Sequence, residues 1–341
     1  MSNPETTVTP ESRIDEIRDQ RKKEVYEKVK HKPAEDLNLS KQDEMDVTYT
    51  TFDKIFRLSL GEMGIFSGAF YNADFSLTLE QAQRNKCEFI TKQLGLKKGT
   101  RLLDLGCGWG GWLNYVRNNT EAKGVGVNLS SGQTASCRKN GLEVYLRDAR
   151  YVKPEDFGKF DCITAMGSPE HVCTVEDFKA GRQDEVYNNY FKHLYDLLPD
   201  GPGAKMYMQL MVFGRYAPPL EKVDINAHKE SPAYIMALLR KMFPNSWLPY
   251  GGEHFIKCAA PYFKCTFHES GRVDYVQTNK EWTKLYKKFG FRKYWHYLSF
   301  IPTYIRDKEF RWNLNMLLET ANRKAFEREI FDHSRIVFEK V

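Results

Sequence analysis

Arg101-Leu102-Leu103-Asp104-Leu105-Gly106-Cys107-Gly108-Trp109-Gly110-Gly111-Trp112 is the stretch that decides the fold of this chain. Leu102, Leu103 and Leu105 are typical of a buried parallel strand. The glycines that follow permit positive φ and let a ligand approach the backbone closely. The apolar run that begins at Trp112 predicts a helix whose free N–H groups point back at that ligand. The stretch therefore predicts a strand, a glycine turn and a helix around a nucleotide cofactor.

Two classes of cofactor fit a glycine turn of this kind. Gly106, Gly108 and Gly111 satisfy the dinucleotide pattern G-x-G-x-x-G, but a dinucleotide enzyme also needs an acidic residue at the end of the second strand. The second predicted strand ends instead in Asn128-Leu129-Ser130, without an acid. Asp104 gives the pattern D-x-G-x-G, which is that of S-adenosylmethionine (SAM) methyltransferases. A structural glycine turn with no ligand is the remaining alternative.

Composition and charge limit the classes of function. The chain has 341 residues, of which 41% are hydrophobic, enough for one elaborated domain or two modest ones. A net charge of +6 suits a phosphate-bearing small molecule or an anionic lipid surface, and no long basic run indicates a nucleic-acid partner. The seven cysteines are scattered, which indicates reduced thiols and no metal site. With no signal peptide and no run of 18 apolar residues, the sequence predicts a soluble, cytoplasmic protein.

Strands and helices alternate from Gly99 onward, which predicts an α/β fold. The predicted sheet is parallel and Rossmann-like, covered by helices on both faces, with the ligand at the carboxyl ends of its strands. The predicted strands are 101–105, 123–127, 142–147, 160–166 and 206–212, followed by final strands near 261–267 and 334–339. The predicted helices of this region are 79–94, 111–118, 131–139 and 184–198.

We divide the chain into four parts. Residues 1–60 form a polar tail and an N-terminal helical extension, and residues 61–213 form the cofactor-binding core. Residues 214–260 are rich in proline and are interpreted as a helical cap insertion over the site. Residues 261–341 complete the core with the final strands and an aromatic helical region. The N-terminal helix carries a thin apolar stripe, for which packing on its own domain is the main interpretation and transient membrane-surface contact the alternative.

The chain resembles the cyclopropane-fatty-acid synthase (mycolic acid cyclopropane synthase-like) family of class I SAM methyltransferases, over roughly residues 60–310. Matching stretches occur in the family's order: Phe66-Ser67-Gly68-Ala69-Phe70-Tyr71, residues 79–83, 103–111, 126–133, 147–150, 170–172 and 243–249, and Tyr297-Leu298. The resemblance implies a class I methyltransferase sheet with SAM as cofactor. The residues it implies for SAM binding are Phe66, Ser67, Asp104, Gly106, Gly108, Asn128, Leu129, Gln133, Asp148 and Ala149.

The resemblance also implies an anion cage from which this chain departs. Family synthases hold bicarbonate as the proton acceptor, with a Cys in the early loop, the Glu of a Glu-His pair, a His on the following strand and a Tyr near the C-terminus. The corresponding positions here are Gly68, Glu170, Gln209 and Tyr297. The cage is therefore expected to be incomplete. Glu170, His171 and Tyr297 are the predicted catalytic residues.

Transfer of a methyl group from a sulfonium to an alkene carbon leaves a carbocation, which aromatic faces stabilise and a base deprotonates. Glu170 follows the predicted strand 160–166 and, as a buried carboxylate, is expected to have a raised pKa and to act as this base. A helix-start carboxylate is the structural alternative, and Glu253 with His254 is a second candidate pair. The predicted substrate-binding aromatic residues are Phe213, Tyr216, Trp247 and Tyr250.

The sequence leaves several reactions open. The favoured hypothesis is a SAM-dependent C-methyltransferase that acts on an alkene carbon of a lipid or isoprenoid, including prenyl diphosphates, because aromatic residues are abundant and the net charge is positive. The alternatives are a cyclopropane synthase for unsaturated acyl chains and an N-methyltransferase for a small amine. A catalytically inactive, lipid-binding scaffold is disfavoured by the intact glycine turn.

Overall fold

Seven strands form one sheet, in the order β3-β2-β1-β4-β5-β7-β6. The computed structural model describes residues 60–242, 245–288, 290–306, 308, 311 and 321–341, so the predicted N-terminal helical extension lies outside the described residues. The parallel strands are β1 (Arg101–Leu105), β2 (Lys123–Asn128), β3 (Glu143–Leu146), β4 (Cys162–Met166) and β5 (Lys205–Phe213). The last strand of the chain, β7 (Phe331–Lys340), runs antiparallel between β5 and β6 (Phe263–Ser270). The predicted Rossmann-like α/β fold is confirmed, but the sheet is mixed and not wholly parallel as predicted, because β7 runs antiparallel to its two neighbours.

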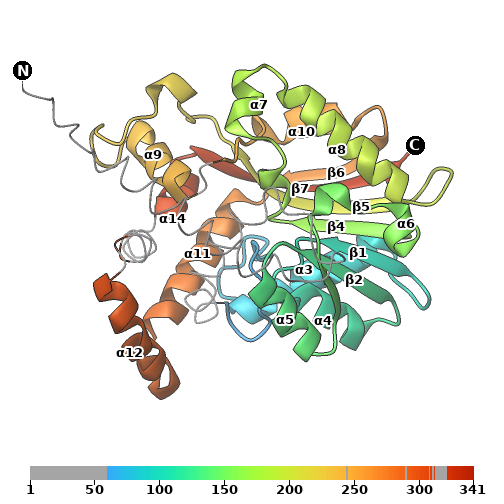
Figure 1. Cartoon of the computed structure of the whole chain (residues 1–341), viewed down its shortest axis with the longest axis horizontal. Coiled ribbons are helices and arrows are strands. Elements are labelled where there is room, and N and C mark those ends of the chain that lie inside the picture. The colour runs from blue at the N-terminus through green and yellow to red at the C-terminus, as the bar shows by residue number, and fades with distance from the viewer. Residues whose placement is uncertain (1–59, 243–244, 289, 307, 309–310, 312–320) are drawn as a thin grey trace, which may run out of the picture.

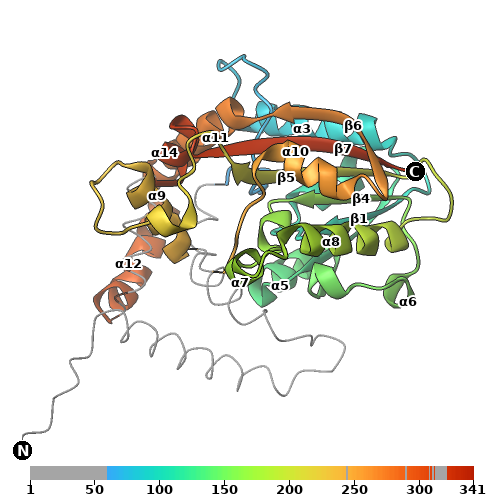
Figure 2. The ribbon, with the colours of Figure 1, turned by 90° about the horizontal axis from the view of Figure 1, so that it is seen from above.

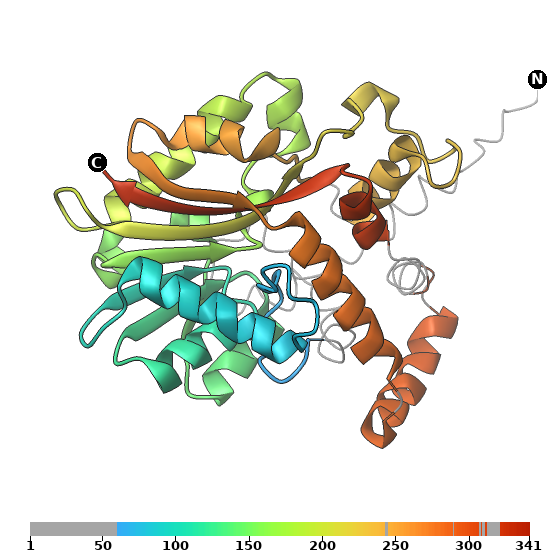
Figure 3. The same ribbon diagram turned by 180° about the vertical axis from the view of Figure 1, so that it is seen from behind.

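Helices cover both faces of the sheet, as Figures 1 and 3 show. One face carries α3 (Leu79–Leu94), α4 (Gly111–Asn119) and α5 (Ser131–Lys139), and the other carries α8 (Gln183–Leu197) and α10 (Gly251–Ala259). The short helices α6 (Pro154–Phe157) and α7 (Val175–Lys179) connect β3 to β4 and β4 to α8. Among the described residues, no helix is both long enough and apolar enough to cross a bilayer.

The remaining helices gather at the carboxyl end of the parallel strands. They are α9 (Pro232–Met242), α11 (Arg272–Lys287), α12 (Phe291–Arg306) and α14 (Ala321–Glu327). Helix α14 packs against α9 and α11, while α12 projects away from the sheet (Figures 1 and 2). The interval 214–260 thus contributes α9 to this group, but its second helix, α10, packs on α8 and on the sheet. The four-part division of the chain stays a prediction.

Helix α3 shows how local sequence positions the site. Thr78 and Gln81 form a capping box at its start, and Gly95 ends it in a left-handed conformation with φ of 63°. Its buried face follows the helical period, with Leu79, Ala82, Gln83, Lys86, Cys87, Ile90 and Leu94. Gln83 and Lys86 are the polar exceptions on this face. Both side chains turn to the loop that precedes the helix, as described below.

The two central strands of the sheet differ in length at the end where the site lies. Met166, the last residue of β4, pairs with Gln209 of β5, and β5 continues to Phe213. Beyond Gln209, β5 has no neighbour on the β4 side, so a backbone donor there needs another partner. On its other side β5 pairs with β7 along its whole length, and this register places Arg335 opposite Gln209 and His333 opposite Met211. Residues that lie directly opposite each other in an antiparallel pair share one face.

Candidate active site

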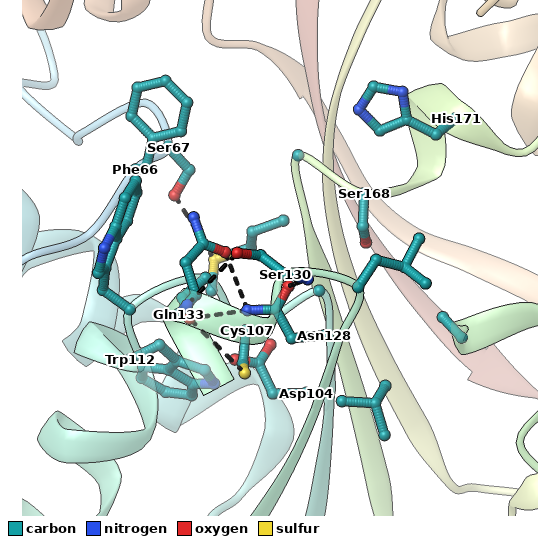
Figure 4. A pocket seen from close by; sticks show the side chains of 18 of the residues that line it. Phe66, Ser67, Asp104, Cys107, Trp112, Asn128, Ser130, Gln133, Ser168 and His171 are labelled. Carbon is teal, nitrogen blue, oxygen red and sulfur yellow. Dashed lines mark hydrogen bonds between the residues drawn. The ribbon is translucent and has the colours of Figure 1, made fainter. Parts of the chain in front are cut away.

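All ten residues predicted to bind SAM line one cavity at the carboxyl ends of β1, β2 and β4. The wall also includes residues that the sequence did not indicate, among them Trp112, Met166, Ser168, Tyr190, Asn245 and Ser246. Figure 4 shows Phe66 and Ser67 on one side of the cavity and Ser168 and His171 on the other, with Asn128 and Gln133 between them. Segments far apart in the chain therefore meet around one space.

The glycine turn forms one wall of the cavity, and its glycines differ in the space around them. Gly106 has φ of 77°, and a Cβ added there would lie 2.5 Å from the Ser168 Cβ. Gly108 has φ of 54°, and a Cβ there would meet nothing within 4 Å, because this position faces open space. Asn128 fixes the turn from β2, since its Nδ2 donates to the Gly108 oxygen at 3.0 Å and to Gln133 Oε1 at 2.9 Å. The turn is thus rigid and leaves room for a ligand at Gly108.

The loop that carries Ser67 is held from behind by two buried side chains of α3. Gln83 Nε2 donates to the Ser67 oxygen at 2.9 Å, and Lys86 Nζ donates to Ser67 Oγ at 2.7 Å. Lys86 is completely buried, and desolvation is the main reason that its pKa falls to about 7. The sequence analysis missed Lys86. The signal that could have found it is a lysine placed within the apolar stripe of an amphipathic helix.

Two acidic residues of the cavity wall have different surroundings. Asp104 on β1 is 2% exposed, and its Oδ1 accepts a hydrogen bond of 2.8 Å from Thr164 Oγ1. Burial raises the pKa of Asp104 to about 7, although Thr164 and the charge of Lys86 act in the opposite direction. Asp148, beyond the end of β3, forms an ion pair with Arg150 through both carboxylate oxygens. A positively charged ligand group would therefore find the less compensated carboxylate at Asp104.

Glu170 lies in a short 3₁₀ turn, residues 169–171. Ser168, which precedes the turn, and His171, which ends it, both line the cavity. Glu170 Oε1 accepts a hydrogen bond of 2.8 Å from the Met211 N–H, the donor on β5 that β4 is too short to reach. Its Oε2 is buried without a partner among the described residues. The expected rise in pKa is found, to about 7, and its cause is desolvation. The adjacent His171 Nδ1 lies 2.7 Å from Ser246 Oγ.

Three side chains and one glycine meet where the family was expected to hold its anion. Gln209 Nε2 donates to the Gly68 oxygen at 2.9 Å. A Cβ added at Gly68 would lie 2.8 Å from His333 Cε1 and 2.9 Å from Tyr275 Cδ2. The rings of Tyr275 and His333 are stacked, 4.3 Å apart and 4° from parallel. The His333 ring therefore takes up space beside Gly68 that a cysteine side chain would need.

The sequence analysis assigned Tyr297 to the anion cage, but this residue does not lie beside Gly68. Tyr297 lies on α12, and its hydroxyl donates to the Tyr286 oxygen at 2.7 Å. The tyrosine that reaches Gly68 is Tyr275 of α11, and burial raises its pKa. Sequence reasoning missed Tyr275 because the C-terminal region contains several tyrosines, and missed His333 because only the β5–β7 register brings it to the site.

The profile of the mycolic acid cyclopropane synthetase family matches residues 38–300 of this chain. The chain belongs to this family of SAM-dependent methyltransferases. Cyclopropane mycolic acid synthase 2 of Mycobacterium leprae is 29% identical over 211 residues, which are 59% of this chain and 65% of that protein, just under two thirds of its length. The SAM-dependent methyltransferase UmaA of Mycobacterium tuberculosis is 24% identical over 272 residues, 75% of this chain and 90% of UmaA.

A solved structure supports the fold of this methyltransferase. The crystal structure of mycolic acid cyclopropane synthase CmaA1 complexed with SAH and CTAB has a TM-score of 0.68 to this chain. The superposition covers 89% of this chain and 99% of that one, at 22% sequence identity. At this identity the likeness concerns the fold, and the roles of individual residues in the methyltransferase depend on their own geometry.

The aromatic residues predicted to bind substrate do not line the cavity of the methyltransferase. Phe213 contacts Trp247 and Tyr250, with ring centroids 4.8 Å and 5.2 Å apart, and Trp247 stacks on Phe178. Trp247 is 1% exposed and is therefore a core residue, whereas Tyr216 is 53% exposed. The cluster is connected to the cavity through Asn245 and Ser246, which precede Trp247 and do line it. A role in substrate binding stays a prediction for these four residues.

The second candidate pair of the methyltransferase lies on the surface of α10. His254 Nε2 is 2.7 Å from Asp184 Oδ1, and His254 Nδ1 accepts from the Tyr250 N–H. Glu253, whose side chain is 82% exposed, lies 3.7 Å from His268. Neither residue lines the cavity, whereas Glu170 is buried between the wall residues Ser168 and His171.

Proposed function

We propose that SAM binds in the cavity with its adenosine over the ends of β2 and β3 and its methionine over the ends of β1 and β4. Nucleotide-binding sheets hold the ribose at the end of the second strand, and here Asn128, Leu129 and Gln133 stand at that place. Asp148 and Ala149 then flank the base, beyond β3. This orientation directs the sulfonium toward Met166 and the 3₁₀ turn that carries Glu170.

We infer that the enzyme transfers the methyl group to an alkene carbon of an unsaturated lipid acyl chain. The alkene π pair attacks the methyl carbon, the C–S bond breaks, and S-adenosylhomocysteine (SAH) leaves. The carbocation that remains on the neighbouring alkene carbon must lose a proton. Loss of a proton from the new methyl group, whose C–H electrons then form a C–C bond, closes a cyclopropane ring. The name of the M. leprae relative favours this outcome on an acyl chain.

The observation that carries the proposal is the state of Glu170. Its carboxyl is buried directly behind the cavity wall, one oxygen has no partner in the described part of the chain, and its pKa is near 7. A general base of this pKa can accept a proton near neutral pH and is not bound to a competing cation. Residues 168–171 would thus place a proton acceptor close to the point of methyl transfer.

A second product is supported by the residues around Gly68. Gln209 and His333 occupy the surroundings in which the family's anion was expected, and they alter the direction from which a proton can be taken. If the proton leaves from the carbon on the far side of the cation, the product is a methyl-branched alkene. The substrate would then be a lipid or an isoprenoid, including a prenyl diphosphate.

The two outcomes can be distinguished with SAM that carries a trideuterated methyl group. We would incubate the enzyme with this SAM and a panel of unsaturated phospholipids, free fatty acids, prenyl diphosphates, sterols and amines, and analyse the products by mass spectrometry. Cyclopropanation retains two of the three deuterium atoms, because one leaves with the base. C-methylation retains all three. Transfer to an amine, with no product from any alkene, would contradict the proposal.

A further inference from the structure

Lys86 is a buried cation that the reaction scheme does not use. It is fully buried on the apolar face of α3, and its Nζ contacts Ser67 twice, at 2.7 Å to Oγ and 3.4 Å to the backbone oxygen. Among the described residues, no carboxylate lies within ion-pair distance of this nitrogen. Burial of an ammonium group without an opposite charge is costly, and a methionine of similar size would avoid that cost. A negative charge that arrives with a ligand would offset this cost and favour the ammonium form.

The contact between Lys86 and Ser67 also orients the serine. Because Nζ donates to Oγ, the hydroxyl proton must point elsewhere, and its other contact is Met166 Sδ at 4.0 Å, a weak acceptor. Ser67 and Met166 both line the cavity. The Ser67 hydroxyl is thus a donor to the cavity, and the ammonium behind it strengthens that donor.

The amino-acid end of SAM is a zwitterion, so its site needs both an acceptor for the ammonium and a donor for the carboxylate. Asp104 provides a carboxylate on the β1 side of the cavity. The arginines of the cavity wall, Arg147 and Arg150, both follow β3, which is two strands away from β1, and Arg150 is paired with Asp148. Lys86, behind Ser67, is the cation next to the methionine end.

We propose that Lys86 is a positioning residue that binds the carboxylate of SAM through the Ser67 hydroxyl. The Lys86 ammonium donates to Ser67 Oγ, and Ser67 in turn donates to the ligand carboxylate. The inference rests on the cofactor orientation proposed above and is independent of the acceptor substrate. The proposed contact distinguishes ligands with an amino-acid carboxylate, such as SAM and SAH, from adenosine thioethers without one.

The test is calorimetric binding of two ligands, SAH and 5′-methylthioadenosine, which lacks the amino-acid end. Lys86→Met should weaken SAH binding by about tenfold or more and 5′-methylthioadenosine binding by less than about twofold, because a charge-assisted hydrogen bond is lost only with SAH. Gln83→Leu is the matched control, since Gln83 supports the same loop through the Ser67 oxygen without a charge. The Gln83→Leu substitution should weaken the binding of SAH and of 5′-methylthioadenosine to the same extent. Ser67→Ala, which keeps Lys86 in place, should repeat the SAH-selective loss even if Lys86→Met folds poorly.

A pH series gives a second readout that a structural role would not change. The titratable and charged groups that face Lys86 are Asp104 on β1, Arg335 and His333 on β7 and the Cys87 thiol, and the Lys86→Met variant retains all of them. Its pKa near 7 means that the free protein loses this charge as the pH rises. The difference in SAH affinity between wild type and Lys86→Met should therefore narrow from pH 6 to pH 9.

The possible results separate the two proposals. Two results would overturn the role of Lys86 without contradicting the cofactor site. One is a loss of affinity in Lys86→Met that is equal for both ligands. The other is a difference in SAH affinity between wild type and Lys86→Met that stays constant with pH. Wild-type protein that binds neither ligand would overturn the cofactor site together with this inference.

Discussion

The Glu170 carboxylate accepts a hydrogen bond of 2.8 Å from the Met211 N–H, at the place where β5 has run past the end of β4. One oxygen of the proposed base thus satisfies a backbone donor that the sheet leaves unpaired, while the other oxygen has no partner among the described residues. The same side chain supplies an acceptor to the sheet and keeps one oxygen for the proton transfer that we propose. Its replacement therefore has to preserve an acceptor for Met211.

Glu170→Gln keeps the volume and the acceptor but cannot take a proton. We expect kcat to fall by about 10²- to 10⁴-fold, with the affinity for SAH nearly unchanged, because the loss affects the chemical step. Steady-state kinetics and calorimetry measure the two quantities. Glu253→Gln, on the surface of α10, is the control and should retain the wild-type rate. The wild-type rate should rise with pH through about 7, since only ionised Glu170 is a base. Full turnover by Glu170→Gln would show that Glu170 is structural.

Above neutral pH, the Glu170→Gln variant should be more stable than the wild-type protein. The pKa of Glu170 is raised from 4.5 to about 7 in the folded protein, so its contribution to stability is fully present below pH 4.5 and is lost as the pH rises through 7. At pH 8 the folded state holds a buried charge, at a cost of about 3 kcal/mol, which glutamine avoids. Urea unfolding should show Glu170→Gln more stable than wild type at pH 8 and equal to it near pH 4.5. If the free energies of unfolding of wild type and Glu170→Gln differed by the same amount at both pH values, this explanation would be wrong.

Gly108→Val should abolish SAH binding and leave the fold intact. Gly108 has φ of 54°, and the new side chain would enter the open space of the cavity. Gly201→Val is a matched control for backbone strain, because Gly201 also has positive φ, 87°, and no atom within 4 Å of an added Cβ, but lies outside the cavity. Both variants should lose similar stability in thermal unfolding, and only Gly108→Val should lose binding. Normal SAH binding by Gly108→Val would place the cofactor elsewhere.

Added bicarbonate should not change the rate. His333 and Tyr275 surround Gly68 so closely that the family's cysteine cannot be accommodated there without displacing a ring. Turnover in degassed buffer should therefore agree with turnover in buffer that contains bicarbonate. Gly68→Cys should lower thermal stability, and the double variant Gly68→Cys, His333→Ala should recover part of it, because the imidazole no longer obstructs the new side chain. A clear activation by bicarbonate would show that an anion is held despite the altered surroundings.

The sequence predicted the strands well, and the residues that it assigned to the cofactor do line one cavity, because the signals of both are local. Asp104, Gly106 and Asn128 each stand next to the end of a predicted strand, and parallel strands bring their carboxyl ends together. Lys86, Tyr275 and His333 carry no such signal. Each comes from a distant element, and His333 reaches Gly68 only through the register of β7 on β5. The confusion of Tyr297 with Tyr275 has the same origin, since motif order along the chain does not show which of two helices faces the sheet.

The insertion of β7 between β5 and β6 makes the far C-terminal part of the chain one folding unit. Strand β6 pairs with β7 and with no other described strand, so β6 has no place in the sheet until β7 has formed. Arg335 of β7 adds to this dependence, because it bonds the Ala69 oxygen, Asp274 of α11 and Glu269 of β6. Local opening of β7 would therefore release β6, loosen α11 and free the loop at Gly68 together. The glycine turn that follows β1 and is held by Asn128 of β2 lies in the other half of the sheet and takes part in none of these contacts.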